Sequence, residues 1–542
     1  MFARLFHPDA QSPVAQFSSG NGRLKQVTDS SEWTTDTDAE KGAVKHIDHA
    51  AVDVPQAIAE EDEGPNVGLA AYEQSKALGE ITPEQNKRIR VRIDLLLLPL
   101  FLITQTLQYL DKTALNYAKV FGMEKAMGMH GNQYSLGAAI FYIGYMVAQP
   151  GWQYALGRLH AGKVLGVSAF IWGLTVLVMV WSKNFTHVMV TRFFLGVFEA
   201  AVTPGLSLMT GWWYKRDEIP LRQTIWYSAV GWGGMIGSLM AAGISKMDDH
   251  PTPRWKLIFY ILGAVTMALG ICLYFFLADG PSTAKWIKKE DRPAAVNRVA
   301  QSGVGLKTTN FNWTHGFQAL KDPKTWFLSI AMFGFSVPNG VLTNFSGTII
   351  KGLGYSTFNA ALLDCAGRSL QVISLLIAGL VATRWANTRL LMMTIGNLIC
   401  VLGTAMMSFL PFTHKYTWAR LIGFWLVNTQ SIGFTIGLVM VSSNIGAYSK
   451  RVVTSSCIFV AYCVGNIVGP LTALESEAPR YQTAAYSMMA GYILKTICHG
   501  LLWVYMWRDN KSRDKKYGPA DPVAAADNGM KGMTENENIH FR

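Results

Sequence analysis

Long apolar runs separated by short polar loops dominate the chain from about residue 93 to residue 507. Twelve of these runs hold about twenty residues each, which is enough to cross a bilayer as an α-helix. Their approximate limits are 93–115, 134–155, 164–182, 186–210, 223–244, 256–277, 325–343, 361–382, 390–410, 418–440, 452–472 and 484–507. The pattern predicts an all-α membrane protein with twelve transmembrane helices.

A longer polar segment, rich in Lys and Arg, divides the twelve runs into two groups of six. The chain ends are polar and show no sustained periodicity, which is typical of disordered tails. The predicted organisation is a disordered N-terminal tail over 1–90, a six-helix bundle over 91–278, a linker loop over 279–324, a second six-helix bundle over 325–507 and a disordered C-terminal tail over 508–542.

Composition agrees with a membrane protein. Half of the 542 residues are hydrophobic and only 15% are charged, whereas a soluble protein carries about 25% charged residues. The six cysteines fall in apolar stretches without metal-ligand spacing, so we expect buried hydrophobic side chains, no metal site and no cofactor. No HExxH motif and no pair of catalytic carboxylates appears in a polar segment, and we do not expect an enzyme.

The net charge of +12 is unevenly distributed. Residues 1–86 hold 15 acidic and 6 basic residues, a net charge of −9, so the remainder carries +21. In a soluble protein this excess would suggest nucleic acid as a partner, but here it lies in the loops. With the N-terminus placed in the cytoplasm, inner loops hold roughly 26 Lys and Arg and outer loops roughly 10, which follows the positive-inside rule. We therefore expect both termini to be cytoplasmic and no binding of nucleic acid.

The fourth run contains two charged residues, Arg192 and Glu199. Seven residues are close to two helical turns, so both side chains lie on one face, about 10 Å and 20 Å into the membrane. A charge at mid-membrane costs roughly 2.5 to 3.5 kcal/mol and usually faces a water-filled ion or substrate pathway. The alternative is a structural ion pair that joins two helices.

Several segments resemble one transporter family. They are YLDKTALNYAKVFGM (109–123), QYSLGAAIFYIGYMVAQPG (133–151), RFFLGVFEAAVTPG followed by GWWYKRDE (192–218), RWKLIFYILG (254–263), FLADGPSTAKWI (276–287), DPKTW (322–326), PNGVLTNF (338–345), NIGAYSKR (444–451) and GNIVGP (465–470). Their order and spacing resemble the fungal allantoate permease family, within the anion:cation symporters of the major facilitator superfamily.

This resemblance implies the major facilitator fold and proton-coupled uptake of a small organic anion. The substrate class would be carboxylates such as allantoate, another ureido acid or a vitamin-type acid. The other expected partners are protons and the lipid bilayer, and the protein is expected to work as a monomer in the plasma membrane. Two alternatives remain open: an exporter of a secondary metabolite with the same fold, and a nutrient sensor that binds ligand without net transport.

The resemblance also assigns roles to four residues. Lys112 and Arg192 would attract the carboxylate, while Glu199 and Asp111 would carry or sense the proton. Helix depth places Asp111 level with Arg192 in the outer third of the membrane, so we also expect these two residues to pair when no substrate is bound. Lys112 stands where relatives often have Arg, and a Lys lacks the bidentate fork of a guanidinium. Alternatively, Asp111 and Lys112 lie in a wet outer vestibule.

The second half offers further polar candidates. Asp364 and Arg368 are four residues apart on one helix, in a favourable order for an ion pair. Arg368 is either a substrate-specificity contact or one half of a pair that neutralises itself. Asn339 and Gln371 are candidate substrate contacts, with interhelical hydrogen bonds as the alternative. Lys495 and His499 in the last run are ambiguous between a functional and a packing role.

Overall fold

The computed structural model describes residues 81–130, 133–245, 252–300, 311–385, 387–477 and 480–541. Regular secondary structure within these ranges is helical, without a β-strand. The N-terminal helices are α2 (Pro83–Val120), α4 (Gln133–Arg158), α5 (Ala161–Val178), α6 (Phe185–Glu199), α7 (Val202–Trp213), α8 (Ile219–Tyr227), α9 (Ala229–Ser245) and α10 (Arg254–Phe276). The C-terminal helices are α13 (Pro323–Gly352), α14 (Thr357–Arg384), α15 (Arg389–Phe409), α16 (Thr417–Val427), α17 (Ser431–Asn444), α18 (Tyr448–Leu471) and α19 (Gln482–Tyr517).

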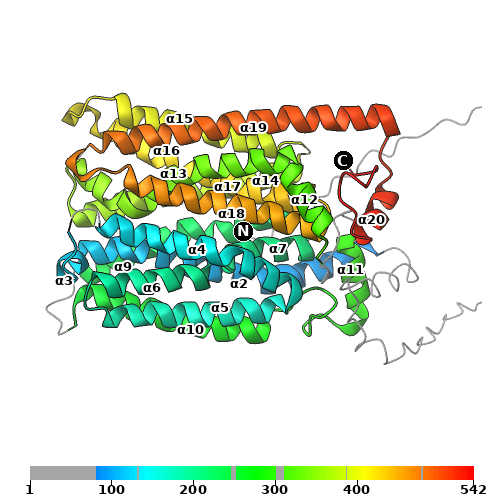
Figure 1. The fold of residues 1–542 in the computed structure, drawn as a ribbon, viewed down its shortest axis with the longest axis horizontal. Coiled ribbons are helices and arrows are strands. Elements are labelled where there is room, and N and C mark those ends of the chain that lie inside the picture. Colours follow the sequence, from blue (N-terminus) through cyan, green and yellow to red (C-terminus); the bar gives the residue numbers. More distant parts are fainter. Residues whose placement is uncertain are drawn as a thin grey trace, which may run out of the picture. The chain divides into compact units, whose positions relative to one another are not determined.

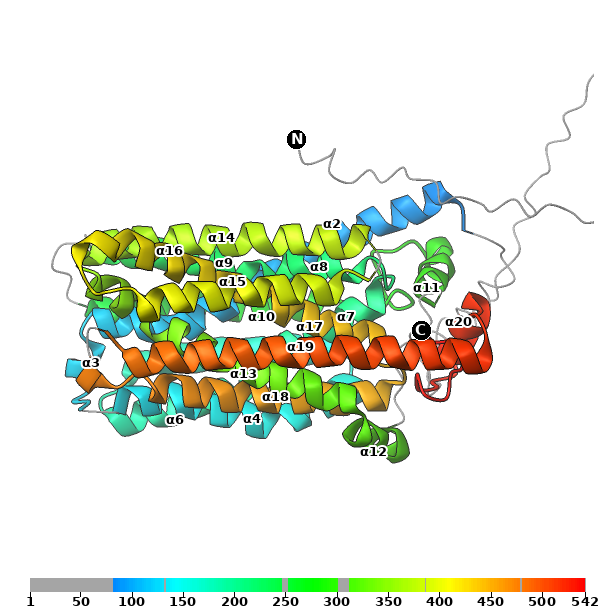
Figure 2. The same cartoon turned by 90° about the horizontal axis from the view of Figure 1, so that it is seen from above.

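The long helices run side by side along a common direction (Figures 1 and 2). Among the N-terminal helices, α5 packs on α10, α4 on α6, and α2 on α9. Among the C-terminal helices, α13 packs on α18 and α19, and α15 packs on α19. Between the two groups, α4 packs on α18, α14 on α8 and α9, α7 on α17, and α2 on α13. Any cavity between the two groups is therefore lined by both parts of the chain.

Nine helical segments in the described ranges are long and apolar enough to cross a membrane. They are Pro83–Val120, Ala161–Trp181, Phe185–Trp213, Arg254–Phe276, Pro323–Gly352, Phe358–Arg384, Arg389–Phe409, His414–Asn444 and Tyr448–Leu471. The other three predicted spans are also helical, as α4, α8 with α9, and α19. Helix α4 is rich in glutamine, tyrosine and glycine, which suits a helix that packs against α18 of the C-terminal group. The span formed by α8 and α9 is interrupted at Ser228.

Three of the predicted spans are interrupted, two of them near their middles and one near its start. The span 186–210 is divided into α6 and α7 at Ala200 and Ala201, directly after Glu199. The span 223–244 is divided into α8 and α9 at Ser228, and the span 418–440 into α16 and α17 by a 3₁₀ turn, Asn428–Gln430. The hydrophobic pattern does not reveal these interruptions, because apolar stretches continue on both sides of each one.

The predicted boundary between the N-terminal tail and the first helix lies too far along the chain. Residues 1–80 lie outside the described residues, but helix α2 begins at Pro83 and not after residue 90. Thr82 caps the helix, since its hydroxyl oxygen accepts a hydrogen bond from the backbone N–H of Gln85 at 3.3 Å, and proline is favoured in the first turn. The basic residues that follow are held in the helix by partners, since Arg88 pairs with Asp291 at 2.7 Å.

The linker and the C-terminal tail are also more ordered than predicted. The predicted loop 279–324 contains α11 (Arg292–Ala300) and α12 (Trp313–Lys321). The predicted disordered tail 508–542 contains the last two turns or more of α19, which ends at Tyr517, and a further helix, α20 (Pro522–Met530). Both segments are polar, so their order comes from ion pairs and caps that a hydrophobic pattern cannot show.

Small residues allow the closest helix contacts. A Cβ atom at Gly196 of α6 would overlap with the backbone carbonyl oxygen of Phe141 in α4, and a Cβ at Gly144 of α4 would overlap with the carbonyl oxygen of Phe193. Glycine at these two positions lets the backbones approach closely, as is common in membrane helix pairs. This contact fixes α6, and with it Glu199, against α4.

Candidate functional site

A narrow cavity lies where the N-terminal and C-terminal helices meet. Its volume is about 20 Å³, which is room for about one water molecule. It is lined by Gln105, Tyr109 and Lys112 of α2, Tyr145 of α4, Thr203 of α7, Tyr227 of α8, Val230 of α9, Asn339 and Thr343 of α13, Ser431 and Phe434 of α17, and Phe459 and Tyr462 of α18. The three helix interruptions place Thr203, Tyr227 and Ser431 at this wall.

The charged centre of the site is an ion pair between Lys112 and Glu199. The Lys112 ammonium nitrogen lies 3.1 Å from a Glu199 carboxylate oxygen, and the Glu199 side chain is fully buried. The same ammonium lies 5.6 Å from the ring centre of Tyr145 and 5.9 Å from that of Tyr462. Lys112 therefore lines the cavity, while its partner Glu199 does not.

This pairing corrects one expectation. No nitrogen of Arg192 lies within ion-pair distance of Asp111 among the described residues; a carboxylate oxygen of Asp111 accepts a hydrogen bond from the indole N–H of Trp172 at 2.9 Å. Asp111 belongs to α2 and Arg192 to α6. Both side chains are almost completely buried, and two guanidinium nitrogens of Arg192 have no hydrogen-bond partner. Arg192 and Asp111 therefore lie beside the site without lining the cavity.

Arg368 forms the ion pair that its spacing predicts and also connects the two helix groups. Its Nε lies 3.3 Å from a carboxylate oxygen of Asp364, and its Nη1 donates a hydrogen bond to the hydroxyl of Tyr109 at 2.5 Å. Asp364 also accepts a hydrogen bond from Ser238 of α9 at 3.3 Å. Since Tyr109 lines the cavity, Arg368 is one residue removed from it.

The two predicted amide contacts have partners in neighbouring helices. Asn339 lines the cavity and donates a hydrogen bond to the side-chain oxygen of Asn466 at 2.9 Å. Gln371 donates a hydrogen bond to the hydroxyl of Ser431, which lines the cavity. Both residues thus form interhelical hydrogen bonds, one at the cavity wall and one directly behind it.

Several lining residues were missed by the sequence analysis. Gln105 lies seven residues before Lys112, on the same face of α2, so helical spacing could have found it. The hydroxyl of Thr203 donates to Gln105 at 3.3 Å and to Gln108 at 2.6 Å. Phe434 and Tyr462 carry no such signal, because only packing between the two groups brings them to the cavity.

Comparisons with known proteins agree with this architecture. The family model of the Major Facilitator Superfamily matches residues 101–470. An uncharacterized transporter of Schizosaccharomyces pombe is 32% identical over 465 residues, covering 85% of this chain and 87% of the relative. The allantoate permease of Saccharomyces cerevisiae is 29% identical over 491 residues, covering 87% and 88%. The thiamine pathway transporter of the same yeast is 26% identical over 437 residues, covering 80% and 82%.

Solved structures support the same fold. The proton:xylose symporter XylE, bound to 6-bromo-6-deoxy-D-glucose, superposes with a TM-score of 0.58 at 14% sequence identity, covering 78% of this chain and 96% of that chain.

The chain belongs to the major facilitator superfamily, whose members are multi-pass membrane proteins that transport small solutes. Within this superfamily it is similar to fungal transporters, among them the allantoate permease of Saccharomyces cerevisiae.

Replacing Lys112 alone should destabilise the protein, because Glu199 would remain buried without its partner, a loss of about 3 to 5 kcal/mol for a buried pair. We expect Lys112→Met to lower the unfolding temperature of the purified protein in detergent. The double variant Lys112→Met with Glu199→Gln should recover most of that loss. Equal unfolding temperatures for the single and the double variant would contradict the pairing.

Proposed function

We propose that the protein is a proton-coupled symporter that carries a small organic anion into the cell across the plasma membrane. The transported class is a carboxylate such as allantoate, another ureido acid or a vitamin-type acid. The proposal includes twelve membrane spans with both termini in the cytoplasm, and a monomer as the working unit. The observation that carries it is the buried Lys112–Glu199 pair at the wall of a cavity shared by both helix groups.

The substrate carboxylate and the Glu199 carboxylate compete for one ammonium. When a substrate anion enters the cavity and takes Lys112, Glu199 loses its counter-charge while it is still buried. A buried, unpaired carboxylate is costly, so Glu199 takes up a proton. Substrate and proton therefore bind together, which is the requirement for symport.

The remaining predicted residues support this exchange. Arg192 adds positive charge beside the site for the incoming anion, and Asp111 serves as a second carboxylate that carries or senses the proton. Asn339 and Gln371, through Ser431, offer amide and hydroxyl groups that orient the substrate. Arg368 acts through Tyr109, whose hydroxyl it holds at the cavity.

The membrane potential makes this coupling necessary. A negative interior opposes the entry of an anion by about 2.3 kcal/mol per charge at 100 mV. One proton neutralises a monoanion, and a second proton makes its uptake electrogenic. Alternating access of the central cavity to the two sides of the membrane then moves both solutes in the same direction.

Uptake assays test the proposal directly. In cells that lack their own carriers, we expect faster uptake of at least one of labelled allantoate, nicotinate, pantothenate or biotin at acid than at neutral pH. Glu199→Gln should abolish pH-driven accumulation and leave exchange of substrate across the membrane. Glu124→Gln, at a partly exposed ion pair with Lys119, is the matched control and should accumulate normally.

Undiminished pH-driven accumulation by Glu199→Gln would refute the role of this residue. Acid-stimulated release of preloaded acid, with no uptake, would favour the exporter. Binding of an acid without uptake or exchange would favour a nutrient sensor.

A further inference from the structure

A second buried lysine lies close to the central cavity and has no carboxylate partner among the described residues. Lys495 of α19 is 1% exposed. Its ammonium donates a hydrogen bond to the backbone carbonyl of Gln430 at 3.2 Å and lies 4.8 Å from the ring centre of Phe335. Among the described residues no acidic oxygen lies within ion-pair distance of it, unlike Lys112, Lys324 and Lys450.

Lys495 reaches a small cavity of its own. This second cavity is lined by Leu328, Ala331, Met332 and Phe335 of α13, Gly433, Phe434 and Gly437 of α17, Ile458 of α18, and Lys495 and His499 of α19. Its volume is about 10 Å³. The lysine extends past Gly433, where even a Cβ atom would lie 2.5 Å from the ammonium nitrogen.

The two cavities lie in series. Phe434 lines both of them. The central cavity meets α13 at Asn339 and Thr343, while the second meets it at Leu328 to Phe335, nearer the helix start that follows the linker. A line of aromatic contacts joins the two lysines: Lys112 lies 5.9 Å from Tyr462, Tyr462 lies 5.8 Å from Phe434, Phe434 lies 4.9 Å from Phe335, and Phe335 lies 4.8 Å from Lys495.

We propose that Lys495 is a second binding site for the substrate's carboxylate, occupied after Phe434 moves aside and the anion leaves Lys112 toward the linker end of the bundle. This inference rests on the proposed function. A buried cation without an anion is costly, and a transported carboxylate supplies the missing charge. The vacated Lys112 can then pair with Glu199 again, which releases the proton on the same side.

Substitution of Lys495 should slow turnover and leave binding from outside unchanged. With allantoate, or with whichever acid of the panel wild type takes up, we expect Lys495→Met to lower maximal uptake about tenfold with KM within about twofold. Lys495→Arg should restore part of the rate. Lys511→Met, at an exposed lysine of the same helix, is the control and should match wild type.

The possible outcomes distinguish a failure of the proposed symport from a failure of the Lys495 site. Absence of uptake of every acid by wild type would overturn the proposed function and this site with it. Active wild type with an equally active Lys495→Met would overturn this site alone, as would a higher KM at unchanged maximal rate. If Lys495→Met does not fold, Gly433→Ala tests the same site. The added methyl group displaces the Lys495 ammonium without removing its charge. An unchanged maximal uptake rate in this variant would also overturn the site.

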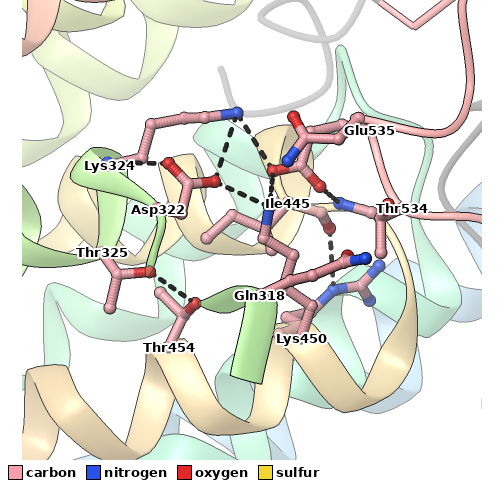
Figure 3. A network of polar contacts seen from close by, with 12 residues as sticks. Gln318, Asp322, Lys324, Thr325, Ile445, Lys450, Thr454, Thr534 and Glu535 are labelled. Carbon is pink, nitrogen blue, oxygen red and sulfur yellow. Dashed lines mark hydrogen bonds and ion pairs between the residues drawn. The ribbon is translucent and has the colours of Figure 1, made fainter. Parts of the chain in front are cut away.

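A different part of the molecule supports a second inference. The segment that follows α20, residues 533–541, folds back on the ends of α13 and α18 (Figure 3). Glu535 is 2% exposed and pairs with Lys450 at 2.6 Å and with Lys324 at 3.0 Å. Lys450 also pairs with Asp322, the cap of α13, at 2.7 Å.

The backbone of this segment is held as well. The N–H of Gly446 donates to Glu535 at 3.0 Å, and the Arg513 guanidinium donates to the carbonyl of Glu535 at 2.6 Å. At its far end, the buried ring of Phe541 lies 5.0 Å from the Arg216 guanidinium. Arg216 belongs to the loop between α7 and α8 and donates to Asn444 of α17 at 2.6 Å. The segment thus contacts both helix groups at one end of the bundle.

The charge that anchors the segment persists at every physiological pH. Burial raises the pKa of Glu535, but the ammonium groups of Lys324 and Lys450 lower it to about 2, from an ordinary value of 4.5. Because this pKa is lower in the folded protein, the stabilisation is fully present above 4.5 and is lost only as the pH falls toward 2. Acidification in cells therefore does not release the segment.

The geometry points to residues 533–541 as a strap that restrains separation of the N-terminal and C-terminal helices at this end. Alternating access requires these helix ends to separate. In each transport cycle the strap must therefore release its contacts at either Glu535 or Phe541. The strap therefore sets the rate of opening without contacting the transported solute.

Labelling of a buried reporter cysteine tests the strap without any substrate. Met440 of α17 is 4% exposed and lines the groove beside Phe541. In a cysteine-free chain carrying Met440→Cys, Glu535→Gln should raise the rate of maleimide labelling about tenfold. Lys531→Ala, at an exposed residue before the strap, should leave the rate unchanged.

An unchanged labelling rate in Glu535→Gln would overturn the strap. If that variant does not fold, a chain that ends at Gly532 tests the same prediction, and slow labelling of the shortened chain would overturn it.

Discussion

A charge buried in a helical membrane protein is costly unless an opposite charge lies beside it, and the candidate site is built on this constraint. Lys112 and Glu199 form one such pair, at 3.1 Å, and Asp364 and Arg368 form another, at 3.3 Å. Each compensated pair is also a position where a solute can substitute for one member. In the proposed mechanism, an incoming carboxylate reaches the Lys112–Glu199 pair first, because Lys112 lines the cavity and Glu199 does not.

The interrupted helices place the polar groups around that pair. α6 ends at Glu199 and α7 begins at Val202, which turns Thr203 toward Gln105 and Gln108 of α2. The break at Ser228 and the 3₁₀ turn before Ser431 bring Tyr227 and Ser431 to the same wall. Discontinuous helices at a binding site are a recurrent feature of secondary transporters, because they direct backbone and side-chain polar groups into the cavity.

Much of this organisation could be predicted from hydrophobic periodicity, but not the parts that depend on specific partners. Apolar runs located the helices, and spacing placed Arg192 with Glu199 and Asp364 with Arg368 on shared faces. Spacing within one helix cannot tell which acid a neighbouring helix presents, so Lys112 was expected to bind substrate while Asp111 paired with Arg192. The ordered start of α2 depends on the Thr82 cap, and the ordered C-terminal segment depends on Glu535 between two lysines. Both are single contacts in polar sequence, which composition alone assigns to disorder.

The central claim is that a substrate carboxylate replaces Glu199 at Lys112 and that a proton then replaces Lys112 at Glu199. Proton exchange with purified, weakly buffered protein, followed with a pH-sensitive dye as allantoate is added, measures this step directly. The account predicts uptake of about one proton per molecule of allantoate bound, and no uptake by Glu199→Gln. Binding of allantoate without proton uptake, or equal uptake by Glu199→Gln, would contradict it.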